Sequence, residues 1–194
     1  MKKLIWSHLF AIVSILGIWY YHVKIDHLMV ILLASVLSLE MGFIAYYSRN
    51  IFIRLLASLG LLFFYPQSLG IFLSLVSLER STKDIWQSNH FMQYMAYLLA
   101  ILFIISSALL SLKLLVNAYD ISKRYQLATV IPVMLFSSFA FCLEKSGSLG
   151  LEGIILNPSA FFNGIQTNIV NLDFKALSCL FLVQLLLWGT LMED

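Results

Sequence analysis

Six long apolar runs divide the 194-residue chain, and they constrain its fold more than any other feature of the sequence. A helix needs about 20 apolar residues to cross about 30 Å of hydrocarbon, and in lipid only a helix or a closed barrel satisfies its own backbone groups. The runs lack the ten-residue alternation that is typical of barrel strands. The sequence therefore predicts an all-α, polytopic transmembrane helix bundle of six spans, roughly at residues 4–21, 28–47, 51–78, 91–116, 127–143 and 176–192.

Composition excludes two broad classes of protein. The chain is 61% hydrophobic and 11% charged, whereas a soluble domain has about 45–50% apolar and about 25% charged residues. Twelve Lys and Arg against ten Asp and Glu give a formal net charge of +2, and these charges are too dispersed for a nucleic-acid interface. Because the sequence has no internal repeat and no long polar linker, we expect one integral membrane domain over residues 1–194.

The distribution of basic residues predicts the orientation. Lys2 and Lys3 precede an apolar run that ends at Tyr21 without a small-residue cleavage site, as in a retained signal anchor. A cytoplasmic N-terminus agrees with the positive-inside rule, and six spans return the C-terminus to the same side. We therefore expect both termini in the cytoplasm, with the chain in a bacterial cytoplasmic membrane. The inner basic residues are then Lys2, Lys3, Arg49, Arg54, Lys113, Lys123 and Arg124, and the outer ones Lys24, Arg80, Lys83, Lys145 and Lys175.

The third run carries a proline near its middle. At about 28 residues it measures about 42 Å as a helix, which is longer than one upright crossing. Pro66 removes a backbone donor and predicts a kink or a break into two half-helices. One interpretation is a transporter-like broken helix, with Pro66 and Gln67 lining a polar cavity. The other is a tilted, proline-kinked span.

The connection 144–175 is long, and its second half is predicted to be an amphipathic helix on the outer side. Asn157 and Pro158 have the N-cap and first-turn identities of a helix start. Apolar side chains then recur at helical spacing while polar ones occupy other faces. The segment is either a lid or partner surface or a structural cover over the bundle. Its candidate residues are Asn157, Pro158, Phe161, Phe162, Asn163 and Gln166.

Few ionisable residues lie inside the expected spans, and such residues are functional candidates because charge at the bilayer centre is costly. Glu40 lies in the second span, and Arg54 opens the third span on the same side. We expect either a Glu40–Arg54 pair or an Arg54 that snorkels to the surface while Glu40 is protonated or bonded to serines. Together with Pro66 and Gln67, they are the candidate binding residues.

Evidence for catalysis or for a metal centre is sparse. The carboxylates Glu79, Asp84, Glu144 and Glu152 lie on the expected outer side without a nucleophile or a metal motif. His22, Asp26 and His27 straddle a helix end and supply no fourth ligand. Cys142 and Cys179 are interpreted as small hydrophobic residues. No catalytic residue, metal or cofactor is therefore predicted.

Three segments resemble an uncharacterised family of six-span bacterial membrane proteins of about 200 residues. They are 39–46 in the second span, 62–68 in the third, and 139–143 followed by Leu156-Asn157-Pro158 around the fifth. The family's arginine- and tryptophan-rich loop motif is missing, since residues 144–153 here read Glu-Lys-Ser-Gly-Ser-Leu-Gly-Leu-Glu-Gly. The resemblance implies the six-span topology and no activity.

The scarcity of charge within the spans favours a non-enzymatic subunit or accessory factor of a membrane complex, which docks through apolar helix faces. A transporter or small-substrate-binding subunit with a cavity at Pro66 and Gln67 is the first alternative. A membrane enzyme that acts on a lipid-linked substrate is the second. The expected partners are the lipid bilayer and other membrane subunits; the sequence identifies no small-molecule ligand.

Overall fold

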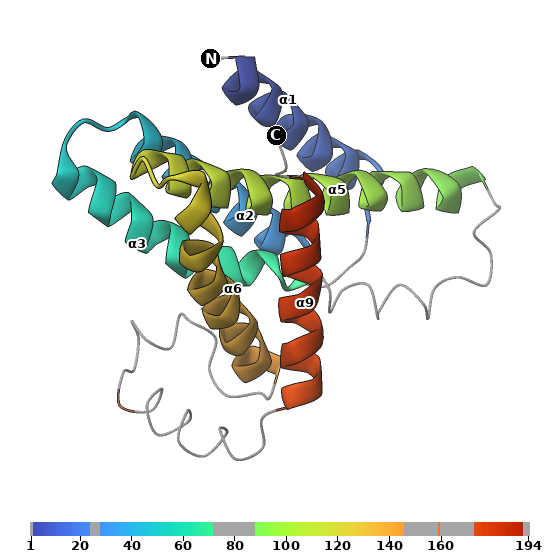
Figure 1. Ribbon diagram of the computed structural model, residues 1–194. Helices are drawn as coiled ribbons and strands as arrows, with labels where there is room; N and C mark the ends of the chain where they lie inside the picture. The colour runs from blue at the N-terminus through green and yellow to red at the C-terminus, as the bar shows by residue number, and fades with distance from the viewer. Residues whose placement is uncertain (1, 24–27, 72–87, 146–158, 160–172, 192–194) are drawn as a thin grey trace. The chain divides into compact units, whose positions relative to one another are not determined.

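The fold is all-helical over the residues that the structure describes. The computed structural model describes residues 2–23, 28–71, 88–145, 159 and 173–191 (Figure 1). These residues form six helices, whose bounds are α1 Lys2–Tyr20, α2 Leu28–Tyr47, α3 Ile51–Ser68, α5 Ser88–Ala118, α6 Lys123–Lys145 and α9 Phe174–Leu191.

Four of these helices are long and apolar enough to cross a membrane: α2, α3, α5 and α6. The apolar parts of α1 and α9, Leu4–Tyr20 and Phe174–Thr190, are shorter than 18 residues. The helical class and the approximate positions of the helices agree with the sequence prediction. Among the described residues the structure shows four long apolar helices, and the predicted number of six spans stays a prediction.

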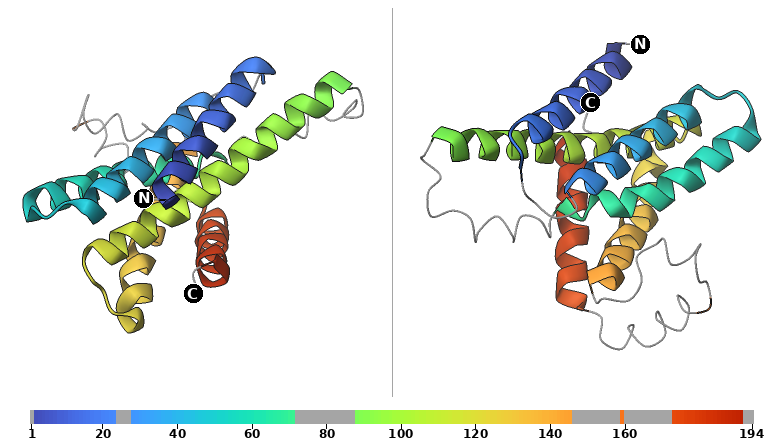
Figure 2. Two further views of the ribbon diagram at one scale, coloured as in Figure 1. Left: turned by 90° about the horizontal axis from the view of Figure 1, so that it is seen from above. Right: turned by 180° about the vertical axis from the view of Figure 1, so that it is seen from behind.

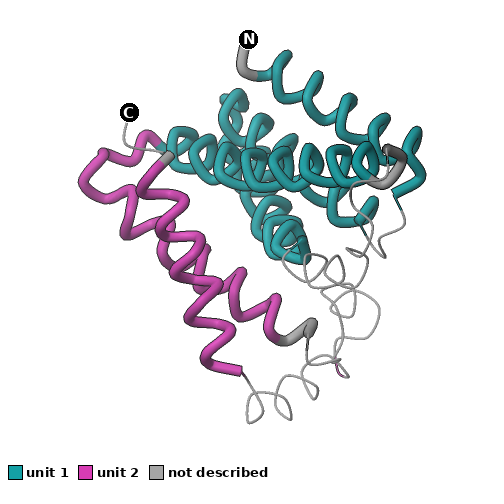
Figure 3. The backbone as a smooth tube through the Cα atoms, turned by 90° about the vertical axis from the view of Figure 1, so that its right-hand side faces the viewer, with its two compact units in different colours: residues 1–119 teal, residues 120–194 magenta. Residues whose placement is uncertain are grey.

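The chain divides into two compact units, residues 1–119 with α1, α2, α3 and α5, and residues 120–194 with α6 and α9 (Figure 3). In the first unit α2 packs against both α3 and α5, and α1 lies mainly on α5 (Figure 2). Buried apolar clusters join the start of α1 to the end of α2, and the end of α1 to the start of α2. The two helices therefore run antiparallel.

Small residues bring α2 and α5 close together. A Cβ atom added at Gly42 of α2 would lie 3.2 Å from the Cα of Ser111 and 3.3 Å from its carbonyl oxygen. Ser38, one turn earlier in α2, donates a 3.4 Å hydrogen bond to the Ser111 hydroxyl. Small residues at helix interfaces allow such close backbone approach, which is a main source of helix association in lipid.

The helix α3 ends ten residues before the predicted end of the third span. Pro66 has no N–H group, and the N–H groups of Leu69 and Gly70 bond instead to the carbonyls of Pro66 and Gln67, at 3.1 and 3.0 Å. These bonds to the third residue back close a tight turn at the helix end. The helix α3 thus ends at Ser68. Whether the third span is kinked or broken into two half-helices stays a prediction, because residues 72–87 lie outside the described part.

Large apolar side chains are exposed on all six described helices. Examples are Ile5 on α1, Leu33 on α2, Leu56 on α3, Leu102 on α5 and Phe136 on α6, and α9 exposes Leu186. Of the two cysteines, Cys142 is buried and Cys179 is exposed on α9. Because soluble monomers rarely expose contiguous apolar surface on this scale, these faces are suited to lipid or to other membrane helices.

Candidate functional site

An ionisable pair joins α1 to α2 in the first unit. The Nε2 atom of His8 lies 2.7 Å from Oε1 of Glu40, and the two side chains are 43% and 35% exposed. The Nδ1 atom of the same ring lies 2.7 Å from the carbonyl oxygen of Leu4, one turn earlier in α1. His8 is six residues from the start of α1 and Glu40 seven from the end of α2. Both are therefore about 10 Å from the same end of the helix pair.

The surroundings of this pair are apolar and aromatic. The ring of Phe43 stacks on His8 at 6.4 Å between centroids, and the ring of Tyr47 stacks on Phe43 at 6.3 Å. Phe43 also belongs to a buried cluster with Leu39 and Leu114. In such surroundings an ion pair or a shared proton keeps the net charge of the two side chains at zero, which lowers the cost of placing them in an apolar helix.

Arg54 does not form the pair with Glu40 that was one of the two alternatives for it. Its Nη2 donates a 2.9 Å hydrogen bond to the carbonyl of Ser48, just past the end of α2, and its guanidinium carbon lies 5.8 Å from the centre of the Tyr119 ring. The guanidinium charge thus lies at the C-terminal end of α2, where the helix dipole is negative. The Tyr119 hydroxyl lies 3.0 Å from that of Ser58. Glu40 pairs with α1 instead because His8 lies at the same depth.

Removal of the Arg54 guanidinium is expected to destabilise the first unit. Arg54→Met loses the hydrogen bond to Ser48 and the contact with Tyr119, and we expect the free energy of unfolding in detergent to fall by about 2 kcal/mol. Arg49→Met is the matched control, because Arg49 is exposed and its replacement should change this free energy by less than about 0.5 kcal/mol. Equal losses in the two variants would contradict the role assigned to Arg54.

The remaining sequence-predicted candidates are not brought to this pair. Pro66 is buried in the last turn of α3, and Gln67 is half-buried with its carbonyl bonded to Gly70. A cavity at Pro66 and Gln67 stays a prediction. The outer-segment candidates Asn157, Pro158, Phe161, Phe162, Asn163 and Gln166 lie outside the described residues, as do Glu79, Asp84 and Glu152.

A buried amide links α6 and α9 in the second unit. Gln184 is 3% exposed, and its Oε1 accepts a 3.0 Å hydrogen bond from Ser137 while its Nε2 donates a 2.8 Å bond to Ser138. This arrangement satisfies both ends of the side-chain amide across two helices. It is suited to fixing their register, because polar groups in lipid gain from internal partners.

Sequence analysis missed both His8 and Gln184. Each is a single polar residue inside an apolar run, which gives no local motif. The available signal was matched depth: antiparallel neighbours bring residues at equal distances from one end of a helix pair to the same level. Among described residues, no group of three or more His, Cys, Asp or Glu side chains is arranged to hold a metal ion.

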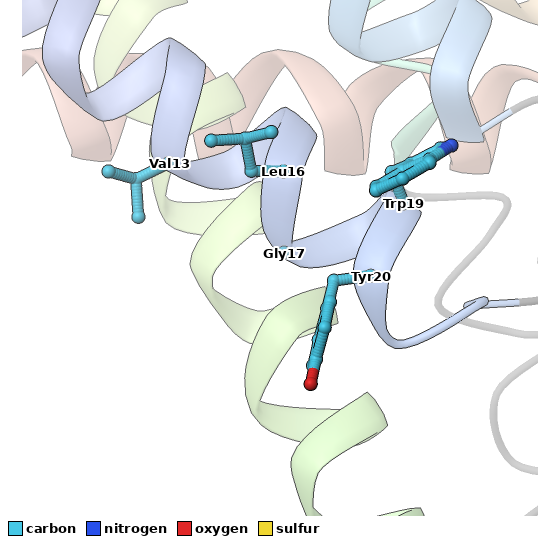
Figure 4. Close-up of a pocket in the computed structure, with 5 residues that line it drawn as sticks. All are labelled: Val13, Leu16, Gly17, Trp19 and Tyr20. Carbon is cyan, nitrogen blue, oxygen red and sulfur yellow. The ribbon is translucent and has the colours of Figure 1, made fainter.

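The exposed face of α1 carries an open apolar groove. It has a volume of about 400 Å³ and is lined by Val13, Leu16, Gly17, Trp19 and Tyr20 (Figure 4). All five residues belong to α1, and a Cβ atom added at Gly17 would lie 3.6 Å from the Cβ of Ala96 on α5, so the groove borders the contact between α1 and α5. An apolar side chain of another membrane helix, or a lipid chain, has the size and character to enter this groove.

Comparison of the whole chain with protein-family models, with curated proteins and with solved structures finds no match. The resemblance to the six-span bacterial family stays a prediction.

Proposed function

We propose that this chain is a six-span, non-enzymatic subunit or accessory factor of a complex in a bacterial cytoplasmic membrane, with both termini in the cytoplasm. Four long apolar helices and the shorter apolar helices α1 and α9 support the membrane location. The preference of basic residues for the inner side supports the orientation.

The docking role rests on the exposed apolar face of α1. Large apolar side chains are exposed along its whole length, and the groove at Gly17 interrupts this face near the end of the helix. Lipid alone needs only an apolar surface, whereas a groove between large side chains can also hold a side chain of a second helix. The proposed occupant is a transmembrane helix of another subunit.

Replacement of Leu16 by tryptophan tests this role. Leu16→Trp replaces the leucine side chain in the groove by a larger indole ring, which leaves less room for a partner. We expect at least about a tenfold loss of the partner chain that copurifies with the full protein in mild detergent. Leu56→Trp on α3 is the matched control, since Leu16 and Leu56 are 56% and 61% exposed. The proposal is wrong if the chain purifies as a lone monomer or if both variants lose the partner equally.

Transport is the second candidate function, and the His8–Glu40 pair is the observation that favours it. Ionisable side chains inside membrane segments commonly belong to ion or proton pathways. A carrier is expected to be recovered alone with a small molecule bound, the outcome that contradicts docking. The same purification therefore separates the two functions.

A further inference from the structure

The ring of His8 lies between two oxygen atoms, and this placement determines how many hydrogens the site holds. Nδ1 lies 2.7 Å from the Leu4 carbonyl oxygen, and Nε2 lies 2.7 Å from Oε1 of Glu40. A backbone carbonyl only accepts, so Nδ1 carries a hydrogen. A nitrogen lone pair and a carboxylate oxygen repel each other at 2.7 Å, so a second hydrogen lies between Nε2 and Oε1.

We infer that His8 and Glu40 form a proton-binding site that holds one proton between α1 and α2. A neutral imidazole supplies one hydrogen and a carboxylate none, whereas the contacts with Leu4 and Glu40 need two hydrogens. The additional proton makes the pair either imidazolium with carboxylate or imidazole with carboxylic acid. Both forms have a net charge of zero. The site gives the bundle a proton-occupied and a proton-free state, and this inference does not depend on the docking role.

Proton release must break one contact. With one hydrogen left for two acceptors, either the bond from Nδ1 to Leu4 or the bond from Nε2 to Glu40 is lost. The pair then carries a net negative charge among Phe43, Leu39 and Leu114, where an uncompensated charge is costly. Because both side chains are partly exposed, the proton can exchange with the surroundings.

Other charged or titratable residues belong to the two helices of the pair or to helices packed against them. On α5, Lys113 adjoins Leu114 of the apolar cluster, and on α2, Tyr47 stacks on Phe43. On α3, which packs against α2, Arg54 is bonded to Ser48 and lies over Tyr119. On α1 itself, Lys2 and Lys3 lie within the first turn. Among the described residues, the structure gives Glu40 an ion pair with His8.

The test follows both members of the pair in the full protein in lipid nanodiscs from about pH 5 to about pH 9. Nitrogen NMR of the His8 ring detects imidazolium, and infrared absorption of the Glu40 carboxyl group detects the acid. We expect one of these two signals to be present when the site is occupied. That signal should be lost in a single step over this pH range, because the proton belongs to the pair.

Two variants assign the signals. In Glu40→Gln the amide donates to Nε2 of neutral His8, so the contact persists without the additional proton, and we expect any imidazolium signal of the occupied state to be lost. In His8→Gln the new amide donates to the Glu40 carboxylate, which again needs no additional proton. His22, exposed in the turn after α1, is the matched histidine. In His22→Gln the signals of the pair should be unchanged.

Three results would overturn the proton site. The first is neutral His8 together with ionised Glu40 throughout the pH range. The second is separate midpoints for the two groups. The third is an unchanged signal in the variant that keeps the reporting group, which is Glu40→Gln for imidazolium and His8→Gln for the carboxylic acid. If that variant does not fold, the first two results still test the site in the unsubstituted protein.

Discussion

Replacement of Gly42 by leucine is expected to lower the free energy of unfolding of the first unit by about 3 kcal/mol. A Cβ atom there already lies 3.2 Å from the Ser111 Cα and 3.3 Å from its carbonyl oxygen, so the obstacle is backbone rather than a side-chain tip. A larger side chain must push α2 away from α5 or bend one of them. Denaturant unfolding of the full chain in mild detergent, followed by circular dichroism, measures the loss.

Two other glycines serve as matched controls for Gly42. At Gly60 an added Cβ would meet the Met41 sulfur at 3.1 Å, and this flexible thioether side chain can move away. At Gly189 it would meet nothing within 4 Å. We expect the loss for leucine to decrease from Gly42 to Gly60 to Gly189, where it should be below about 0.5 kcal/mol. Equal losses at the three positions would mean that the close α2–α5 contact does not determine the effect.

The positions of the helices were predictable because apolar length in the sequence maps directly onto helix length. The bounds of α2 agree with the predicted 28–47, and those of α5 differ from the predicted 91–116 by three and two residues. The end of α3 was less predictable. A proline is compatible with a kinked helix or with a helix end, and the tertiary contacts of the segment decide between them.

Side-chain partners were harder to predict than helices. The sequence places Glu40 and Arg54 on one side of the membrane, but it does not say which helix covers which face of α2. In the structure α1 brings His8 to Glu40. Arg54 instead finds a carbonyl six residues away in the chain, at Ser48. A local acceptor was available for Arg54 as soon as the turn between α2 and α3 formed, so no distant carboxylate was needed.

The Gln184 network illustrates the same limit in the second unit. Ser137 and Ser138 are small residues suited to close packing, but the sequence does not indicate which amide joins them. Ser137 is eight residues from the end of α6 and Gln184 ten from the start of α9, which places them at depths of about 12 and 15 Å. Matched depth in antiparallel helices is therefore consistent with this contact and with that of His8 and Glu40, but it does not say which helices are neighbours.

Replacement of Gln184 by alanine is expected to lower the free energy of unfolding of the second unit by about 3 kcal/mol. The change leaves a cavity between α6 and α9 and removes the partner of both serine hydroxyls. Gln184→Met keeps most of the volume and removes only the hydrogen bonds, so it should cost about 1 kcal/mol. Denaturant unfolding in detergent, with a fluorescent probe in this unit, measures both variants, and the difference between them is the packing contribution.

The contribution of the hydrogen bonds themselves follows from a double-mutant cycle of Gln184→Met with Ser137→Ala. We expect a coupling free energy of about 0.6 kcal/mol and at most about 1.7 kcal/mol, because the hydroxyl of Ser137 also donates to the Met134 carbonyl within its own helix. Gln126→Met is the matched control, since the amide of Gln126 donates to Ile121 before α6 and does not join the two helices. A coupling of zero would mean that the bond between Gln184 and Ser137 contributes nothing to the stability of this unit.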